Sequence, residues 1–436
     1  MIARLNKIMT GKTLAIAVWV LRVAVGAVFV MSGLVKSIDL WGFCFKIEEY
    51  LVVWNVDMPQ SLCLIAALLI SSAEFILGMM LAVGAYRRSC PWLLTLMMVP
   101  FMLPLSVYIF IADPVADCGC FGDFWHISNG ATLLKNVIIS AALIIIVIYN
   151  KRVKGLYRPY TQWIPGIMCF AYIIGVGLWG YNVQPPMDFR SFPEGTSLVD
   201  EESEDVTFDF VYEKDNVRKS FTADNLPDST WTFVDRVAKG GEIESKTDFV
   251  VYDGDDEVGA DIISEEGPQI LIVVPDHKRA NISYTYSINE LQRLMEKAGG
   301  SLVEITSIPE ERLEWWRDMS MASYPIYTAE STMLKELSRG VMSAVYMEDG
   351  KIIWKRTLSS IDIEELNAAS DPVEALESLK PDGGKMLLGS SLLLLAALLL
   401  IMIADRGYGA IKSREKHSHS KKMSNFVPVQ PHEHDQ

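Results

Sequence analysis

Two cysteines separated by one glycine carry the clearest potential chemistry in this chain of 436 residues. Cys118 and Cys120 lie in the stretch DCGCFGDF, residues 117–124, a short acidic connection between two long apolar runs. A Cys-x-Cys pair can be a thiol–disulfide couple, half of a metal site, or two unrelated thiols. The compartment that the connection faces decides among these, because disulfides form and exchange in oxidising surroundings.

Geometry limits what this pair can do. A disulfide between residues i and i+2 needs Cα atoms closer than about 7 Å, so the segment must turn. Gly119 gives the backbone the freedom to do so. The small ring is strained, and a strained disulfide exchanges easily, which suits a redox relay better than a structural staple.

The metal alternative uses Cys118, Cys120 and His126 as three soft or borderline ligands. The spacing matches no recognised zinc finger or knuckle, and the sequence offers no obvious fourth ligand. We therefore predict no metal site.

The chain combines 50% hydrophobic residues with 54 acidic and 39 basic ones, a mixture that indicates segregated regions. Residues 184–385 hold 42 Asp and Glu against 20 Lys and Arg, so nucleic acid is excluded as a partner of this region. Apolar runs of about 20 residues, the length that crosses a bilayer, predict a lipid environment. They lie near 14–35, 61–85, 91–112, 131–150, 161–181 and 386–404.

Basic residues predict the orientation, because short connections rich in Lys and Arg stay in the cytoplasm. They cluster before the first run and after the second, fourth and sixth, while the alternate connections are acidic. We therefore expect a protein of the bacterial inner membrane with both termini in the cytoplasm. Residues 184–385 and the Cys118–Cys120 connection would then face the periplasm.

Two ionisable residues fall inside predicted spans. Arg22 lies about nine residues from the cytoplasmic end of the first span and Glu74 about twelve from that end of the second. At about 1.5 Å per residue their depths differ by only about 5 Å, so the sequence predicts a buried Arg22–Glu74 ion pair. The pair would either fix helix packing or handle protons or a quinone.

Small residues in the same two spans predict close helix contact. They are Gly26, Ser32 and Gly33 in the first span and Ser71, Ser72, Ala73 and Gly78 in the second.

A third cysteine lies in the first outer connection. In residues 40–54, LWGFCFKIEEYLVVW, apolar residues recur at steps of three and four, which predicts an amphipathic helix at the membrane interface. Cys44 would face the bundle and is the candidate partner that resolves a mixed disulfide. Cys44 and Cys63 can equally be small buried hydrophobes, as cysteines without a disulfide commonly are.

Three segments resemble the DoxX/MauE family, including its methylamine-utilisation branch. They are RVAVGAVFVMSGLVKSIDLWGFCFKIEEY, AEFILGMMLAVGAYRR and DCGCFGDFW. The resemblance covers about residues 10–155, and the added outer domain and last span resemble a Bacteroidetes-type member. It implies a four-helix membrane module with a part in periplasmic disulfide or redox maturation. The sequence leaves the electron acceptor open, and a quinone near Arg22 or the outer aromatic residues is the candidate cofactor.

From residue 269 onward strands and helices alternate and end in the hairpin MEDGKIIWK and a further helix. This order resembles the thioredoxin-like fold. Where that fold carries Cys-x-x-Cys the chain has PDHKRAN, and where it carries a cis-proline the chain has Val341 and Met342. The region lacks cysteine, so we expect it to bind partners and not to exchange disulfides.

The predicted fold class is an α-helical membrane bundle with an α/β thioredoxin-like periplasmic domain. The expected parts are a four-helix module (1–157), a fifth span (158–183), a β-rich segment (184–262), the thioredoxin-like domain (263–380), a sixth span (385–404) and a cytoplasmic tail (405–436).

The predicted function is thiol–disulfide redox or protein maturation through Cys118 and Cys120, with periplasmic client proteins as partners. The alternative is a non-enzymatic envelope scaffold whose cysteines are structural.

Overall fold

The computed structural model describes residues 11–115, 118–125, 127–199, 207–214, 217–222, 232–239 and 249–424. The chain forms two compact units. One comprises residues 1–189 and 382–436 and the other residues 190–381.

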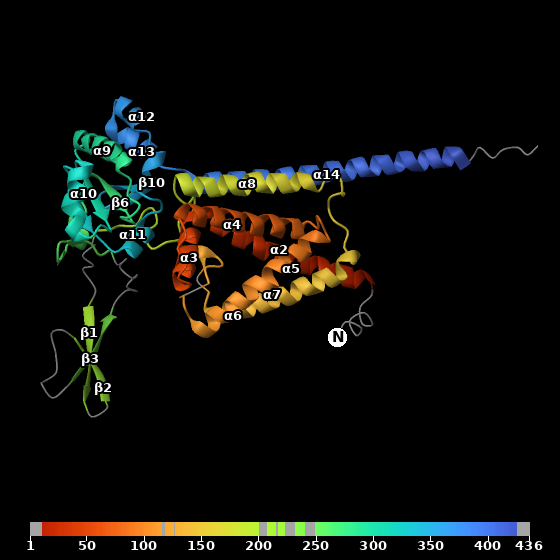
Figure 1. Ribbon diagram of the computed structural model, residues 1–436, viewed down its shortest axis with the longest axis horizontal. Helices are drawn as coiled ribbons and strands as arrows, with labels where there is room; N and C mark the ends of the chain where they lie inside the picture. Colours follow the sequence, from red (N-terminus) through yellow and green to blue (C-terminus); the bar gives the residue numbers. More distant parts are fainter. Residues whose placement is uncertain are drawn as a thin grey trace, which may run out of the picture. The chain divides into compact units, whose positions relative to one another are not determined.

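The first unit is a helical bundle. Its described part holds six helices long and apolar enough to cross a membrane, as predicted: Lys12–Ile38, Gln60–Ala82, Ser89–Ala112, Asn129–Tyr149, Trp163–Asn182 and one within Pro372–Glu415. In the labels of Figure 1 these are α2 (Gly11–Ile38), α4 (Gln60–Ala82), α5 to α6 (Ser89–Ala112), α7 (Asn129–Tyr149), α8 (Trp163–Asn182) and α14 (Gly383–Ser424). The number and length of these helices make this a multi-pass membrane protein.

Two local features shape the bundle. The third span consists of α5 (Ser89–Met97), a π-helical turn (Met98–Met102) and α6 (Leu103–Ala112). Pro100 lies in that turn, where its missing N–H and its ring disturb the regular helical hydrogen bonds. Helix α3 (Leu40–Val53) begins after Asp39, whose side chain accepts from the N–H of Gly42 at 2.8 Å.

The second unit contains a seven-stranded mixed sheet with the order β10-β9-β6-β7-β8-β4-β5. Strand β6 pairs in parallel with β7 and antiparallel with β9. The strands are β4 (Tyr252–Asp253), β5 (Asp256–Glu257), β6 (Pro268–Val274), β7 (Ser301–Thr306), β8 (Ile326–Thr328), β9 (Ser343–Glu348) and β10 (Lys351–Thr357). Its helices are α9 (Thr285–Lys297), α10 (Leu313–Ser320), α11 (Ser331–Leu337), α12 (Ile363–Ala368) and α13 (Pro372–Ser378).

Both faces of this sheet are covered. Successive side chains of a strand point to opposite faces, and in β6 Ile270 and Ile272 join one buried cluster while Leu271 and Val273 join the other. Residues of α9, α10, α12 and α13 complete the first cluster, and residues of α11 complete the second. The continuous apolar run of β6 is therefore that of a central strand.

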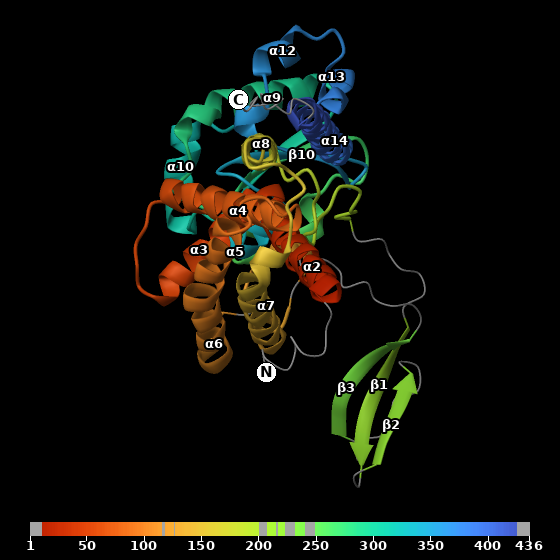
Figure 2. The ribbon, with the colours of Figure 1, turned by 90° about the vertical axis from the view of Figure 1, so that its right-hand side faces the viewer.

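The β9–β10 hairpin has the predicted turn at Asp349 and Gly350, both with positive φ. Strands β1 (Thr207–Lys214), β2 (Val217–Thr222) and β3 (Thr232–Lys239) form a separate antiparallel sheet with β1 in the middle (Figure 2). These three strands lie within residues 184–262, for which the sequence predicts β-structure.

Helices α2 and α4 touch backbone to backbone, as the small residues predict. A Cβ atom added at Gly33 would lie 2.5 Å from the carbonyl oxygen of Ser71 and 2.5 Å from the amide nitrogen of Phe75. One added at Gly78 would lie 2.8 Å from the carbonyl oxygen of Gly26. Only glycine permits this distance of approach.

We predict that Gly33→Ala destabilises the bundle by about 1–3 kcal/mol, because the new methyl group meets backbone atoms that cannot move alone. Thermal unfolding of the purified protein in detergent measures the effect. Gly175→Ala in α8 is the matched control, since nothing lies within 4 Å of the added Cβ there. Equal midpoints for the two variants would contradict the close contact.

Candidate functional site

The Cys118–Cys120 segment is a tight turn that brings the two sulfur atoms to 3.0 Å. Gly119, at φ +65°, has the left-handed backbone conformation that the turn requires. A Cβ atom there would also lie 2.5 Å from Cγ of Lys46. The two sulfur atoms are thus closer than two thiols in ordinary van der Waals contact. A disulfide between them could form without a large movement of the backbone.

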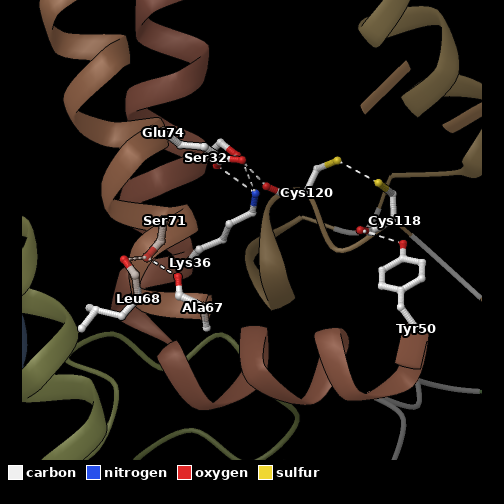
Figure 3. Close-up of polar contacts among 9 residues, drawn as sticks. All are labelled: Ser32, Lys36, Tyr50, Ala67, Leu68, Ser71, Glu74, Cys118 and Cys120. Carbon is white, nitrogen blue, oxygen red and sulfur yellow. Dashed lines mark hydrogen bonds and ion pairs between the residues drawn. The ribbon is translucent and has the colours of Figure 1, made fainter. Parts of the chain in front are cut away.

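Two hydroxyl groups from different helices hold the backbone of this turn (Figure 3). The Tyr50 hydroxyl on α3 donates to the carbonyl oxygen of Cys118 at 3.1 Å. The Ser32 hydroxyl on α2 lies 2.8 Å from the carbonyl oxygen of Cys120 and 2.8 Å from Oε2 of Glu74. A hydroxyl group has one proton, so Ser32 donates to one of these two acceptors at a time.

A buried ion pair stands beside the turn. Nζ of Lys36 on α2 lies 2.8 Å from both carboxylate oxygens of Glu74 on α4, and the two side chains are only 7% and 6% exposed. The ammonium group also lies 4.9 Å from the ring centroid of Phe43. Because Ser32 and Lys36 are four residues apart on one helix face, both reach the same carboxylate.

The predicted Arg22–Glu74 ion pair is wrong. Arg22 is fully buried, and its Nε donates to the carbonyl oxygen of Leu81 at 3.2 Å. Leu81 is seven residues beyond Glu74, which at about 1.5 Å per residue is about 10 Å along α4. The prediction failed because it measured depth from the ends of the apolar runs, and because Lys36 was taken to lie beyond the first one.

A cavity of about 40 Å³ adjoins the ion pair and the turn. Its polar lining comes from Ser32, Lys36, Glu74, Lys135 and Asn136, and the rest from Val28, Phe29, Met98, Met102, Cys120, Phe121 and Ile139. Sites for small organic molecules measure about 300–1,000 Å³. The cavity therefore has room for water-sized molecules but does not fit a quinone ring.

The surroundings separate the acidities of the two thiols. The hydrogen bond between the two sulfur atoms lowers the pKa of Cys120 below its ordinary value, and the cations Lys135 and Lys36 act in the same direction, against burial and the Glu74 charge. That hydrogen bond and burial raise the pKa of Cys118. These opposite shifts favour one thiolate, on Cys120, and one thiol, on Cys118, which is the state in which a dithiol attacks a disulfide.

The other cysteines lie elsewhere in the bundle. Cys44 is fully buried and packs with Cys63, Leu40 and Ala67, and its sulfur lies 3.9 Å from Oε1 of Glu48. The helix that carries Cys44 is confirmed, and its place at the membrane interface and the role of Cys44 as a resolving partner stay predictions. Cys90 and Cys169 belong to the apolar core of the bundle.

No group of three or more His, Cys, Asp or Glu side chains is arranged to hold a metal ion within the residues described. His126, the third ligand of the metal alternative, lies outside the described residues.

Sequence reasoning missed Ser32, Lys36, Tyr50 and Lys135 as parts of this site. The Ser32–Lys36 spacing was the available signal, because a lysine one helical turn after a serine near the end of an apolar run lies on the same helix face. The sequence around Tyr50 and Lys135 does not predict their place in the site, because it depends on how α3 and α7 pack against the turn.

Residues 14–149 match the model of the family described as methylamine utilisation protein MauE. Residues 206–240 match a domain of unknown function, DUF8463. No curated protein and no solved structure matches the chain. The family match covers the Cys118–Cys120 turn and all the residues that line the cavity beside it.

We predict that Lys36→Met destabilises the protein by about 3–5 kcal/mol, because it leaves the Glu74 carboxylate buried without its cation. The double variant Lys36→Met/Glu74→Met should recover most of this loss. Unfolding in detergent measures both. Lys385→Met, which breaks an exposed ion pair with Asp382, is the control and should cost less than about 1 kcal/mol. A double variant as unstable as the single one would contradict the assignment.

We further predict that alkylation of Cys120 by iodoacetamide rises through a midpoint below pH 9, the ordinary value for a thiol, because its surroundings lower the pKa of Cys120. Lys135→Met should raise the midpoint by about one unit. Cys118→Ala should raise it further, because it removes the largest cause of the lowered pKa. Peptide mass spectrometry follows the labelled residue, and the exposed Lys151 provides the control Lys151→Met. A midpoint near 9 in the unaltered protein would refute the arrangement.

Proposed function

We propose that the membrane bundle catalyses thiol–disulfide exchange with client proteins through Cys118 and Cys120. The observation that carries this proposal is the turn itself, in which two thiol sulfurs lie 3.0 Å apart beside a buried Lys36–Glu74 ion pair. A charged pair inside a membrane bundle is costly, and such residues mark functional sites by default.

The exchange proceeds in two balanced steps. The Cys120 thiolate attacks a client disulfide, forms a mixed disulfide and releases one client thiolate. The Cys118 thiol gives its proton to the client thiolate released first and attacks the Cys120 sulfur, which releases the second client thiolate. The client disulfide has then become one thiol and one thiolate, which takes a proton from water, and Cys118 and Cys120 have become a disulfide. The reverse sequence oxidises a client dithiol.

Two groups of residues support these steps. Lys36 and Lys135 stabilise the negative charge on Cys120, as their influence on its pKa indicates. Ser32 and Tyr50 hold the two backbone carbonyls of the turn, so that the sulfurs remain in reach of each other while their bonding changes.

We place the cysteine turn in the periplasm of a bacterial cell, with both termini in the cytoplasm. The acidic connections that alternate with basic ones support this orientation. An oxidising compartment is also the one in which the pair could cycle.

The sheet of the second unit would be a thioredoxin-like module that binds clients. In support, β6, β7, β9 and β10 combine a parallel pair with an antiparallel hairpin, as that fold does. The whole region 190–381 lacks cysteine, so its contribution would be recognition. The wider likeness to DoxX proteins of Bacteroidetes type belongs to the same proposal.

A structural role for the pair is the second candidate. The anchoring of both turn carbonyls by Tyr50 and Ser32 favours it, because a loop-closing staple needs such anchors as much as a relay does. The protein would then be an envelope scaffold whose outer unit binds a partner.

We predict that Cys118→Ser traps clients as mixed disulfides on Cys120, because the resolving sulfur is missing. Diagonal gels and mass spectrometry of cells treated with an alkylating agent detect the adducts. Cys169→Ser, a change inside the bundle core, is the matched control and should trap none.

In the unaltered protein the pair should be found partly as thiols and partly as disulfide, in proportions that change with growth conditions. If the pair stays fully oxidised and Cys118→Ser yields no mixed disulfide, the exchange proposal is rejected and a structural disulfide is favoured.

A further inference from the structure

A second, larger cavity lies at the other end of the helical bundle. It measures about 830 Å³. Three segments form it: the connection after α4, the connection before α8, and the part of α14 from Asp405 to Ala410. Its volume is within the range of about 300–1,000 Å³ that is usual for small-molecule sites.

The lining of this cavity is strongly basic. It includes Arg87, Arg88, Lys154, Arg158 and Arg406, and Asp405 is the carboxylate among them. That carboxylate is already engaged. Its oxygens accept from Arg158 Nε at 2.8 Å and from the Thr161 hydroxyl at 2.8 Å, and it is 5% exposed.

The other four cations have no acidic partner in the part of the chain that the structure describes. Arg87 donates to the carbonyl oxygen of Val153, and Arg406 donates to those of Leu156 and Gly155. These bonds orient the guanidinium groups but do not neutralise them. Arg88 and Lys154 are exposed at the cavity.

Exposed aromatic residues mark the depth of the cavity relative to a bilayer. Tyr86 lines it, and Tyr160, Trp163 and Tyr408 lie on the same connections and helix, all of them exposed. Tyrosine and tryptophan gather at the level of lipid headgroups. The charged cavity therefore opens where phosphate groups of lipids are located.

We propose that this cavity binds a phosphate-bearing anion, and that the headgroup of an anionic phospholipid is its source. Guanidinium groups bind phosphate oxygens in pairs of hydrogen bonds, and basic pockets between membrane helices suit lipid headgroups. Four cations without acidic partners and a volume far above that of one phosphate group fit a headgroup with two phosphates. The proposal is independent of the chemistry at Cys118 and Cys120.

The test uses the full chain, purified in neutral detergent and stripped of lipid, with binding measured by native mass spectrometry. The probes are diphosphatidylglycerol, phosphatidylcholine and inorganic pyrophosphate. Diphosphatidylglycerol should bind, and phosphatidylcholine should not compete with it. Arg88→Gln/Lys154→Gln should weaken binding about thirtyfold, since each basic residue near an anionic headgroup contributes a factor of about five.

Lys412→Gln/Arg414→Gln is the matched control, because it removes the same charge from exposed positions of α14 outside the cavity. It should change binding by less than about twofold. Pyrophosphate binding that depends on Arg88 and Lys154, without lipid binding, would support the site and assign it a soluble ligand. Equal losses in both double variants, or no binding of any probe, would overturn the proposal.

Discussion

The ion pair between Lys36 and Glu74 is the interaction on which the cysteine site depends. Taking two charges out of water costs several kcal/mol for each ion, and a lipid environment offers no water to replace the lost contacts. The pair is stable only because α2 and α4 bring the two groups to 2.8 Å. Glycines at the helix contact permit that approach, so Gly33 and Gly78 serve the ion pair as well as the packing. The carboxylate in turn holds Ser32, which reaches the turn that carries Cys120.

This chain of contacts explains how a bundle of mostly apolar helices can position reactive sulfurs in a loop. Loops are usually the most mobile part of a membrane protein, yet here helices α2 and α3 each fix one carbonyl of the turn. Lys36, which pairs with Glu74, and Lys135, which lines the cavity, also favour the thiolate of Cys120. The position of the cysteine turn and the acidity of Cys120 therefore depend on the same small group of side chains.

The sequence predicted much of the fold, because its signals are local. Six apolar runs, the Asp349–Gly350 turn and the alternation of strands and helices after residue 269 all correspond to elements of the structure. The site was predicted only in part. The cysteine turn can be recognised from three consecutive residues, Cys118, Gly119 and Cys120. The partner of Glu74 cannot, because it depends on which faces of α2 and α4 meet. Depth measured from the ends of the apolar runs placed Arg22 level with Glu74, whereas in the structure Arg22 lies level with Leu81 and Lys36 pairs with the carboxylate.

The Ser32 hydroxyl has a consequence of its own. One hydrogen atom serves two rival acceptors, the Glu74 carboxylate and the Cys120 carbonyl. When the hydrogen points to Cys120, Glu74 keeps its ion pair with Lys36, and when it points to Glu74, the Cys120 carbonyl oxygen loses its bond to α2. The hold of the bundle on the cysteine turn is thereby coupled to the rotation of a single hydroxyl group.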